Sequence, residues 1–369
     1  MRLEIRPREK LTRAQDATLS GLAVGLALVI GGAVMAAAGL PPLAAYAAML
    51  RAGFLGGAYA LSDLAVKTIP LILCGIGCAL AFRAGLWNVG AEGQLLLGAW
   101  AATGVASFWT PLALSAWLKL PLMMLAGLAA GALWAAVPAV LKIRYRVSEI
   151  LSSLMLVYVA AQWNNYWIYS PWSDRGFQLT PLFPENAWLP RLSDFADRFP
   201  ALAGLTVHLG LLPALLAVIL LAALMKRSRW GAVWRAMGDN PAAARAAGLN
   251  PRFHVLVVLL ISGAAAGLAG AVEVSGVVHR LQERFSPGFG FTAITVAWLA
   301  RLNPWATVVV AVLFGGLLVG GKEIGGAGIS QLLQGALLLV VILTEWFRRY
   351  EIRRREPAPD RPAGEAERS

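Results

Sequence analysis

The side chains that could do chemistry are few in this sequence, and they form no recognisable catalytic set. The three histidines, His208, His254 and His279, are scattered along the chain, and no Ser/His/Asp or Cys/His combination has the spacing of a nucleophilic site. Cys74 and Cys78 lie within one apolar run, which favours two small packing residues over a disulfide or a metal pair. We therefore expect no catalytic residue, no metal site and no cofactor.

One string has the spacing of a nucleotide-binding loop. Gly316, Gly321 and Lys322 match the Gly-x4-Gly-Lys pattern. However, an apolar run precedes the string instead of a strand, and Glu323 follows where Ser or Thr should bind magnesium. The chain therefore does not supply its own ATPase, and any energy from ATP must come through a partner.

Polar side chains inside apolar segments are better functional candidates, because such groups are costly in a bilayer and usually face a cavity or the bundle interior. The run from Phe82 to Gln94 places Asn88, Glu92 and Gln94 among three glycines. This pattern suits irregular backbone that lines a pathway. The alternative is a tight turn followed by a packed helix.

Four further residues are candidates for the same pathway: Ser152, Glu273, Thr292 and Thr295. Glu273 is the clearest buried acid, and an ion pair with Arg280 is the alternative explanation for it. Because these segments carry many uncharged hydrogen-bonding groups and few charges, they suit a neutral polar solute.

The composition indicates what must position these residues. The 369 residues are 58% hydrophobic and only 14% charged, whereas a soluble domain would carry roughly a quarter charged residues. The apolar residues come in runs of about 20, the length that crosses a bilayer. Glycine pairs such as Gly127/Gly131 and Gly263/Gly267 place small residues on one helix face, where backbones can approach. The sequence predicts an all-α, polytopic integral membrane helix bundle.

About ten transmembrane helices are expected in a membrane domain at 18–347, after a basic N-terminal segment at 1–17. The expected spans are 18–40, 61–82, 90–109, 119–141, 148–168, 206–225, 253–277, 287–300, 304–320 and 328–347. Residues 41–60 could form an additional interfacial helix, and 286–300 is short enough to be re-entrant. The first apolar run is too long for a typical cleaved signal, so we expect it to be retained.

The distribution of positive charge predicts the orientation. With both termini in the cytoplasm, most of the 32 Lys and Arg residues lie inside, as the positive-inside rule requires. The outside then holds Arg51, Lys67, Lys119, Arg175, Arg191, Arg198, Arg280, Arg284 and Lys322. Because the positive residues cluster at the ends of apolar runs, the net charge of +12 indicates membrane topology and not nucleic acid binding.

A polar loop at 226–252 lies between apolar runs and carries six basic residues. An amphipathic element at 230–237 is followed by a turn, and Asn240 can cap a second helix that begins at Pro241 and ends near Gly248. This pattern favours a docking surface for a soluble partner over a plain charged loop.

Two other segments lack membrane character. Residues 169–205 form the longest extracytoplasmic loop, and its aromatic side chains fit either interfacial packing or partner docking. The tail at 348–369 is basic and then rich in Pro and Glu, which is typical of disorder.

Several segments in register resemble the permease subunits of bacterial ABC importers, in the branch that serves simple sugars, nucleosides and branched-chain amino acids. The nucleoside type is the most similar, and the resemblance covers residues 60 to 345. Its motifs are AFRAGLWNVGAEGQLLLGAW (81–100), VSEILSSLMLVYVA (147–160), WRAMGDNPAAARAAGLN (234–250) and the Gly-rich run at 288–321. One departure concerns the Glu-Ala-Ala-x3-Gly pattern of such permeases, because Ala242 stands in place of the Glu.

The resemblance implies a permease subunit in the inner membrane that carries a nucleoside or related simple sugar, and not an enzyme. Its implied partners are an ATPase subunit that binds ATP, a second and different permease chain, an extracytoplasmic binding protein and membrane lipid. The expected coupling residues are Arg235, Gly238, Asp239, Asn240, Pro241, Ala244, Arg245 and Gly248. A branched-chain amino acid permease is one alternative. A stand-alone carrier with proton sites at Glu92 and Glu273 is another, and uptake without an ATPase partner would favour it.

The orientation can be tested at Ala247. A fusion reporter that is active only outside the cell should stay silent there, because the charge distribution places the 226–252 loop in the cytoplasm. Strong reporter activity at Ala247 would overturn the orientation.

Overall fold

The computed structural model describes residues 3–7, 12–324 and 327–354, and the chain divides into two compact units. The first unit comprises residues 1–34 and 333–369, and the second comprises residues 35–332. The division falls within helix α1 (Arg13–Ala37) and within helix α13 (Ala327–Arg349).

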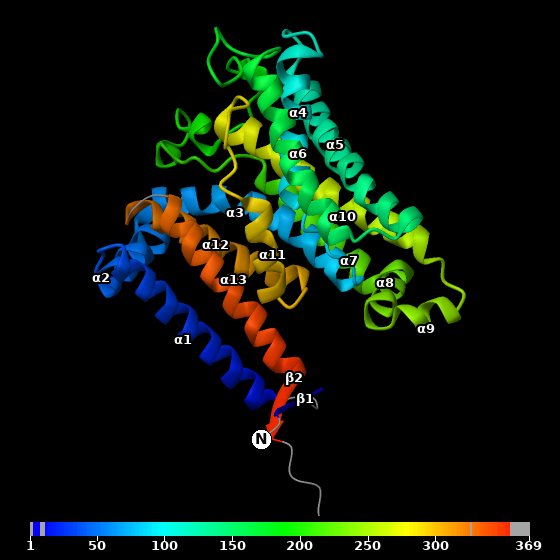
Figure 1. The fold of residues 1–369 in the computed structure, drawn as a ribbon. Helices are drawn as coiled ribbons and strands as arrows, with labels where there is room; N and C mark the ends of the chain where they lie inside the picture. The colour runs from blue at the N-terminus through cyan, green and yellow to red at the C-terminus, as the bar shows by residue number, and fades with distance from the viewer. Residues whose placement is uncertain (1–2, 8–11, 325–326, 355–369) are drawn as a thin grey trace, which may run out of the picture. The chain divides into compact units, whose positions relative to one another are not determined.

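The first unit contains a two-stranded antiparallel ribbon that the sequence did not predict. Strand β1 (Leu3–Pro7) pairs with β2 (Tyr350–Arg354), so that Leu3 lies opposite Arg354 and Pro7 opposite Tyr350 (Figure 1). The all-α prediction therefore holds for the apolar helices and fails at this ribbon. Residues 350–354 form a strand within the predicted disordered tail, and residues 355–369 of that tail lie outside the described residues.

The second unit is a helix bundle. Its α-helices are α2 (Pro42–Leu50), α3 (Gly57–Arg83), α4 (Ala91–Thr103), α5 (Ala116–Tyr145), α6 (Glu149–Tyr169), α7 (Leu211–Arg227), α8 (Arg229–Asp239), α9 (Pro241–Ala246), α10 (Pro251–Glu273), α11 (Phe289–Leu299) and α12 (Pro304–Glu323). Three short 3-10 helices, η3 (Glu185–Ala187), η4 (Leu192–Phe195) and η5 (Pro200–Leu202), lie between α6 and α7.

Helix α3 is the central helix of this unit. Its most apolar 18-residue window is 89% buried, whereas the corresponding window of α5 is only 28% buried. A helix that is apolar on all sides and buried is a core element, and one that keeps its apolar surface exposed suits contact with lipid. The contrast indicates that α3 is surrounded by protein while α5 lies at the periphery.

Helices α4, α5 and α10 approach one another closely at glycines (Figure 1). A Cβ atom added to Gly267 of α10 would overlap the carbonyl oxygen of Gly127 in α5, and one added to Gly98 of α4 would overlap the carbonyl oxygen of Gly267. Gly131 and Gly263 face each other in the same way. The predicted small-residue faces of α5 and α10 are therefore confirmed, and they bring three backbones into contact.

In the part of the chain that the structure describes, three helices end in a π turn, in which the hydrogen bonds join residues five apart. These turns are η1 (Arg51–Leu55) after α2, η2 (Gly104–Phe108) after α4 and η6 (Val274–Val278) after α10. A π turn accommodates one extra residue per turn and often occurs where a helix serves a function.

Among the described residues, four helices are long and apolar enough to cross a membrane: α3, α5, α10 with η6, and α12. The number rises to six if two bent pairs, 21–37 with 42–55 and 211–227 with 229–239, each count as one span. A helix lies at each of the ten predicted positions, although α7 begins at Leu211 and not at 206, and α11 is only 11 residues long. Residues 42–55, which the sequence allowed as an extra helix, are helical.

The segment between α6 and α7 is bonded to the end of α10. The backbone N–H of Phe183 donates to the His279 carbonyl at 2.8 Å, and that of Leu189 donates to the Ser275 carbonyl at 2.9 Å. The Arg191 guanidinium donates to the Gly276 carbonyl at 2.8 Å. The predicted loop at 169–205 is therefore an ordered cover held on η6.

The glycine contact predicts opposite effects for two matched substitutions. Gly267→Ala should lower the melting temperature of the purified protein in detergent, because overpacking of this kind costs about 1–3 kcal/mol. Gly25→Ala should leave it unchanged or raise it slightly, because Gly25 is also helical but has no atom within 4 Å of an added Cβ. Equal melting temperatures for the two variants would contradict the close approach.

Candidate functional site

Three buried polar side chains from two helices and a turn form a closed hydrogen-bonded cluster. The Asn88 amide donates to Gln94 Oε1 at 2.9 Å and to Ser262 Oγ at 2.8 Å. Gln94 Nε2 donates back to Asn88 Oδ1 at 2.9 Å. Asn88, Gln94 and Ser262 are each only 1% exposed. This cluster, hereafter the Asn88 cluster, ties the α3–α4 turn to α4 and to α10.

Glu92 lies where two helices begin. It occupies the first turn of α4, and its carboxylate accepts a hydrogen bond of 2.6 Å from the backbone N–H of Gly290 in the first turn of α11. Gly290 permits this contact, because a Cβ at that position would overlap the Glu92 backbone. A carboxylate is favourable at a helix N-terminus, where unpaired N–H groups point outward. Glu92 therefore joins α4 to α11.

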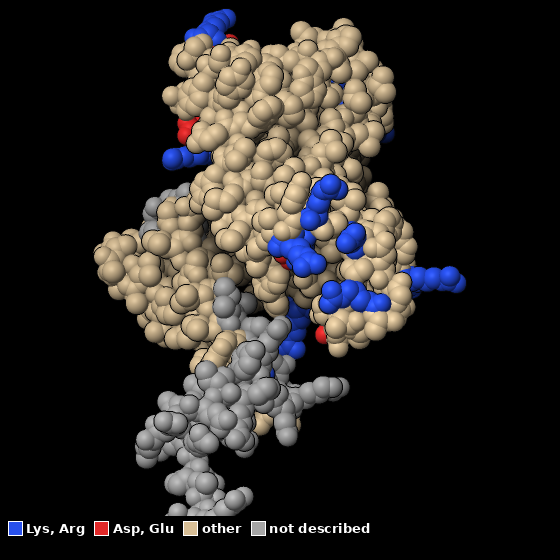
Figure 2. All heavy atoms as spheres, turned by 45° about the vertical axis from the view of Figure 1, so that its right-hand side comes forward, with Lys and Arg blue, Asp and Glu red and all other residues tan. Residues whose placement is uncertain are grey.

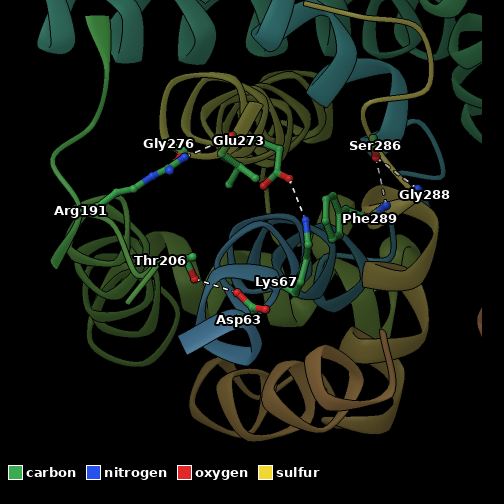
Figure 3. A network of polar contacts seen from close by, with 10 residues as sticks. Asp63, Lys67, Arg191, Thr206, Glu273, Gly276, Ser286, Gly288 and Phe289 are labelled. Carbon is green, nitrogen blue, oxygen red and sulfur yellow. Dashed lines mark hydrogen bonds and ion pairs between the residues drawn. The ribbon is translucent and has the colours of Figure 1, made fainter. Parts of the chain in front are cut away.

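Glu273 forms an ion pair across the bundle. Its carboxylate lies 3.2 Å from Lys67 Nζ of α3, and the Glu273 side chain is 1% exposed (Figure 3). The Lys67 ammonium also lies 5.5 Å from the centre of the Phe289 ring. The partner of Glu273 is thus Lys67, and the alternative pairing with Arg280 is wrong. A cavity of about 380 Å³ adjoins this pair, lined by Asp63, Lys67, Arg191, Lys322 and Glu323 among others.

The remaining predicted pathway residues lie on α6 and α11. Thr292 and Thr295 are buried on α11, and the Ser152 hydroxyl donates to the Ser148 carbonyl within its own helix. The structure therefore groups Asn88 with Gln94, places Glu92 beside α11 with its two threonines, and holds Glu273 apart with Lys67. It does not gather all seven residues around one cavity.

Two histidines hold the cover formed by the α6–α7 segment. His279 stacks on Trp188 with ring centres 4.1 Å apart, and its Nε2 lies 2.6 Å from an Arg191 nitrogen. Burial and the Arg191 guanidinium lower the pKa of His279 to about 4, and they lower the pKa of His208 in the same way. Both rings are therefore neutral at pH 7. The unfolded chain binds protons at these rings more readily than the folded protein does. The free energy of unfolding therefore keeps its full value above about pH 6.5 and decreases as the pH falls towards 4.

Helix α9 is capped as the sequence predicts. The Asn240 side chain accepts hydrogen bonds from the backbone N–H groups of Ala242 and Ala243, at 3.1 and 3.0 Å, and Pro241 is the first residue of α9. Gly248 follows α9 with a positive φ of 79°. These caps stabilise a helix that is too short to persist alone.

Helix α8 rests on the end of α3. A Cβ added to Gly238 would overlap the carbonyl oxygen of Arg83, and Gly85 in the α3–α4 turn lies against the Gly238 backbone. Trp234 is buried, and the Arg235 guanidinium donates to the Met225 carbonyl. Arg235, Gly238 and Ala244 therefore serve the packing of this helix pair. Asp239, Asn240, Pro241, Arg245 and Gly248 form its exposed side.

The exposed side of the α8–α9 pair is part of a basic surface. Figure 2 shows Lys and Arg side chains gathered over the end of the bundle that carries α8 and α9, with few acidic side chains among them. The exposed basic residues in and next to this helix pair are Lys226, Arg227, Arg229, Arg245 and Arg252. Such a surface can bind a soluble partner or anionic lipid head groups.

Long apolar helices, glycine-mediated packing and buried polar clusters together define a polytopic helical membrane protein. The particular family follows from comparison with known proteins. The chain belongs to the family described as branched-chain amino acid transport system / permease component, whose model matches residues 60–342. It is therefore a subunit of a transport system and not an enzyme, as the sequence predicted.

Three relatives illustrate the similarity. The glucose ABC transporter permease protein TsgB13 of Haloferax volcanii is 37% identical, over 94% of this chain and 93% of the relative. The guanosine ABC transporter permease protein NupP of Bacillus subtilis is 34% identical, over 87% and 90%. The nucleoside ABC transporter permease protein NupB of Lactococcus lactis is 27% identical, over 84% of each chain.

Sequence reasoning missed the partners of the predicted residues. Lys67 was counted only among the exterior charges and Ser262 was not singled out, although each is a polar residue inside an apolar run. Lys119 was taken for an exterior charge, yet its side chain is fully buried, and its ammonium donates to the carbonyls of Ala106 and Leu112. On α6 the sequence pointed to Ser152, but it did not point to the polar face formed by Tyr158, Gln162 and Asn165.

Removal of Asn88 should destabilise the bundle. Asn88→Leu leaves the side chains of Gln94 and Ser262 buried without their partner, and each unpaired group costs about 1–3 kcal/mol. We expect a clear fall in the melting temperature in detergent. The matched amide substitution Asn165→Leu should have little effect, because Asn165 bonds only to Gln162 on the helix surface. An unchanged melting temperature for Asn88→Leu would refute the structural role of the cluster.

Proposed function

We propose that this chain is the permease subunit of an ATP-binding-cassette importer that carries a nucleoside or a related simple sugar across a bacterial inner membrane. The family match and the names of the relatives support the class of transport system. The contact between α8 and the α3–α4 turn carries the proposal, because it provides a mechanical route from a surface helix pair into the bundle.

The proposal includes partners that supply what this chain does not. An ATPase subunit binds ATP and docks on α8 and α9, and a second, different permease chain completes the transport path. An extracytoplasmic binding protein delivers the solute, and lipid surrounds the apolar helices. In this proposal the chain itself needs no cofactor or metal and no nucleic acid partner.

In the proposed topology, both termini lie in the cytoplasm and the helices at the ten predicted positions cross or enter the membrane. The α8–α9 pair and the α3–α4 turn then lie at the cytoplasmic side, and the cover between α6 and α7 lies outside. The basic surface in Figure 2 supports this orientation, because positive residues favour the cytoplasmic side.

The proposed coupling residues are those of the 235–248 stretch. Asp239, Asn240, Pro241, Arg245 and Gly248 present the surface that the ATPase contacts, while Arg235, Gly238 and Ala244 fix that surface to the bundle. When the ATPase moves α9, α8 presses on the α3–α4 turn at Gly85. The Asn88 cluster passes this displacement to α10, so that the bundle can alternate between two arrangements.

The proposed solute pathway includes the polar residues of the inner bundle. These residues are Asn88, Glu92, Gln94, Ser152, Glu273, Thr292 and Thr295. Because the Asn88 cluster and the Lys67–Glu273 pair are closed in this structure, they act in this proposal as contacts that rearrange during transport. Glu92 lies on a cavity in the present arrangement.

The docking role of α9 can be tested at Gly248. Gly248→Trp should abolish solute-stimulated ATP hydrolysis in the reconstituted complex, because a bulky side chain would project from the exposed side of α9 into the interface. The affinity of the binding protein for its solute should not change.

Gly39→Trp is the matched control. Gly39 also has a positive φ, of 78°, and an added Cβ meets no atom within 4 Å at either glycine. Both variants therefore carry the same backbone strain and the same new ring, and only Gly248→Trp should uncouple hydrolysis. Normal stimulation in Gly248→Trp would refute the docking role.

A further inference from the structure

A cavity of about 370 Å³ lies between α4, α6, the α10–α11 connection and α11. Its volume is near the lower end for small-molecule sites, which suits a single sugar or nucleoside. Its lining includes Glu92 on α4, Tyr158, Gln162 and Asn164 on α6, Glu283 in the connection and Phe291 on α11. None of these except Glu92 belongs to the predicted pathway.

Helix α6 carries a polar stripe of four residues, and the first three of them line this cavity. Tyr158, Gln162, Asn165 and Tyr169 are spaced by four, three and four residues, which places them on one face of the helix. The neighbouring exposed stripe, which includes Leu151, Met155 and Val159, is apolar. Polar groups exposed at membrane depth are costly unless they face a water-filled cavity or another polar surface. The stripe therefore marks the side of α6 that meets a hydrated path.

The inner wall of the cavity offers hydrogen-bond acceptors. Asn164 is 4% exposed, its amide nitrogen donates to the Leu96 carbonyl at 3.2 Å, and its Oδ1 has no partner. The Glu92 carboxylate lines the same cavity. A buried acceptor without a partner is unfavourable, so a ligand that fits here must bring O–H or N–H donors.

Aromatic rings form the other walls. Tyr158 is 65% exposed and Phe291 is 40% exposed, although both line the cavity. Ring faces of this kind pack against the apolar face of a sugar or against a nucleobase. Aromatic rings beside acceptor groups match a neutral ring that bears several hydroxyl groups.

The charges disfavour an anionic or amino acid ligand. Two carboxylates, Glu92 and Glu283, line the cavity and would repel a ligand carboxylate. Arg284 also lines the cavity, but its side chain is 90% exposed and its Nε lies 3.7 Å from Glu283 Oε1, so that solvent and this carboxylate offset its charge. The Tyr169 hydroxyl donates to Glu283 at 2.8 Å and closes the space between the end of α6 and the connection.

We propose that this cavity is the site where the permease itself holds its solute, a neutral ring that carries vicinal hydroxyl groups. The proposal rests on the importer function proposed above and adds the site and its chemistry. The hydroxyl-bearing ring can be the ribose of a nucleoside or a free hexose. Glu92 lies in the first turn of α4, close in sequence to Asn88 and Gln94. A solute that contacts Glu92 is therefore adjacent to the α3–α4 turn, against which α8 packs.

Protection of an introduced cysteine tests the site directly. The two native cysteines, Cys74 and Cys78, are buried, so they give little background with a thiol reagent. The full chain carrying Gln162→Cys is placed in lipid nanodiscs and treated with a neutral, water-soluble methanethiosulfonate reagent. Guanosine, D-glucose and L-leucine are added separately at millimolar concentration, and the rate of modification is measured.

We expect guanosine or D-glucose to slow the modification of Gln162→Cys several-fold, and L-leucine to leave the rate unchanged. Slowing by guanosine identifies a nucleoside, and slowing by D-glucose identifies a hexose. Tyr166→Cys is the matched control, because Tyr166 is an exposed residue of the same helix that does not line the cavity. Its rate should not respond to any of the three compounds.

Two further variants test the chemistry of the site. Asn164→Leu in the Gln162→Cys background removes the unpaired acceptor, so the protecting concentration should rise by about tenfold, the effect of one hydrogen bond. Tyr158→Leu in the Gln162→Cys background should weaken protection as well. The control Tyr166→Cys, which carries its cysteine at position 166 and keeps Gln162, should still show no protection. Because Tyr158 is exposed, its replacement tests the site even if Asn164→Leu does not fold.

The proposal is overturned if neither guanosine nor D-glucose slows the modification of Gln162→Cys, if L-leucine slows it equally, or if Tyr166→Cys is protected to the same extent. These outcomes are separate from a failure of the importer function, which is read from solute-stimulated ATP hydrolysis in the complete complex. A complex that couples hydrolysis to solute but shows no protection at Gln162→Cys would leave the importer function standing and reject this site.

Discussion

The Asn88 cluster is the interaction on which the rest of the bundle depends. In a membrane, a polar side chain must find its partners within the protein, because lipid offers none. Asn88 meets this requirement with Gln94 and Ser262, and in doing so it fixes the path of the chain between α3 and α4 and the position of α10. Once these three segments are joined, the glycines of α4, α5 and α10 can come into backbone contact. The cluster thus links an exposed helix pair at one end of the bundle to the tightly packed helices within it.

The sequence predicted the local features well, because they depend on residues that are near one another in the chain. The caps at Asn240 and Gly248 are set by one or two side chains and by backbone conformation, and the structure confirms them. The glycine faces of α5 and α10 follow from the helical period alone. Which glycine face meets which helix could not be predicted, because that depends on how distant segments pack.

The partners of buried polar groups were beyond local reasoning for the same reason. Glu273 was recognised as a buried acid, but its nearest basic residue in sequence, Arg280, is not its partner; Lys67 lies 206 positions away and is brought to it by the fold. The burial of Lys119 was not predicted either, because a lysine near the end of an apolar run usually marks the membrane surface. Here the ammonium donates to the backbone carbonyls of Ala106 in η2 and of Leu112 in the segment before α5. The ribbon of β1 and β2 joins residues from opposite ends of the chain, and no local pattern marks it.

The π turn η6 at the end of α10 influences the direction of the segment that leads to α11. A π turn takes in one more residue than an α turn, so every side chain beyond it is rotated by about 100° from where a continuous α-helix would place it. His279 follows η6 directly, has a left-handed φ of 56°, and faces Trp188 and Arg191. Deletion of a single residue within 274–278 would therefore re-aim the whole segment that leads to α11, even though it changes the length of the chain by only one position. The direction of this outer segment therefore depends on the number of residues in η6, and not on the strength of any single contact.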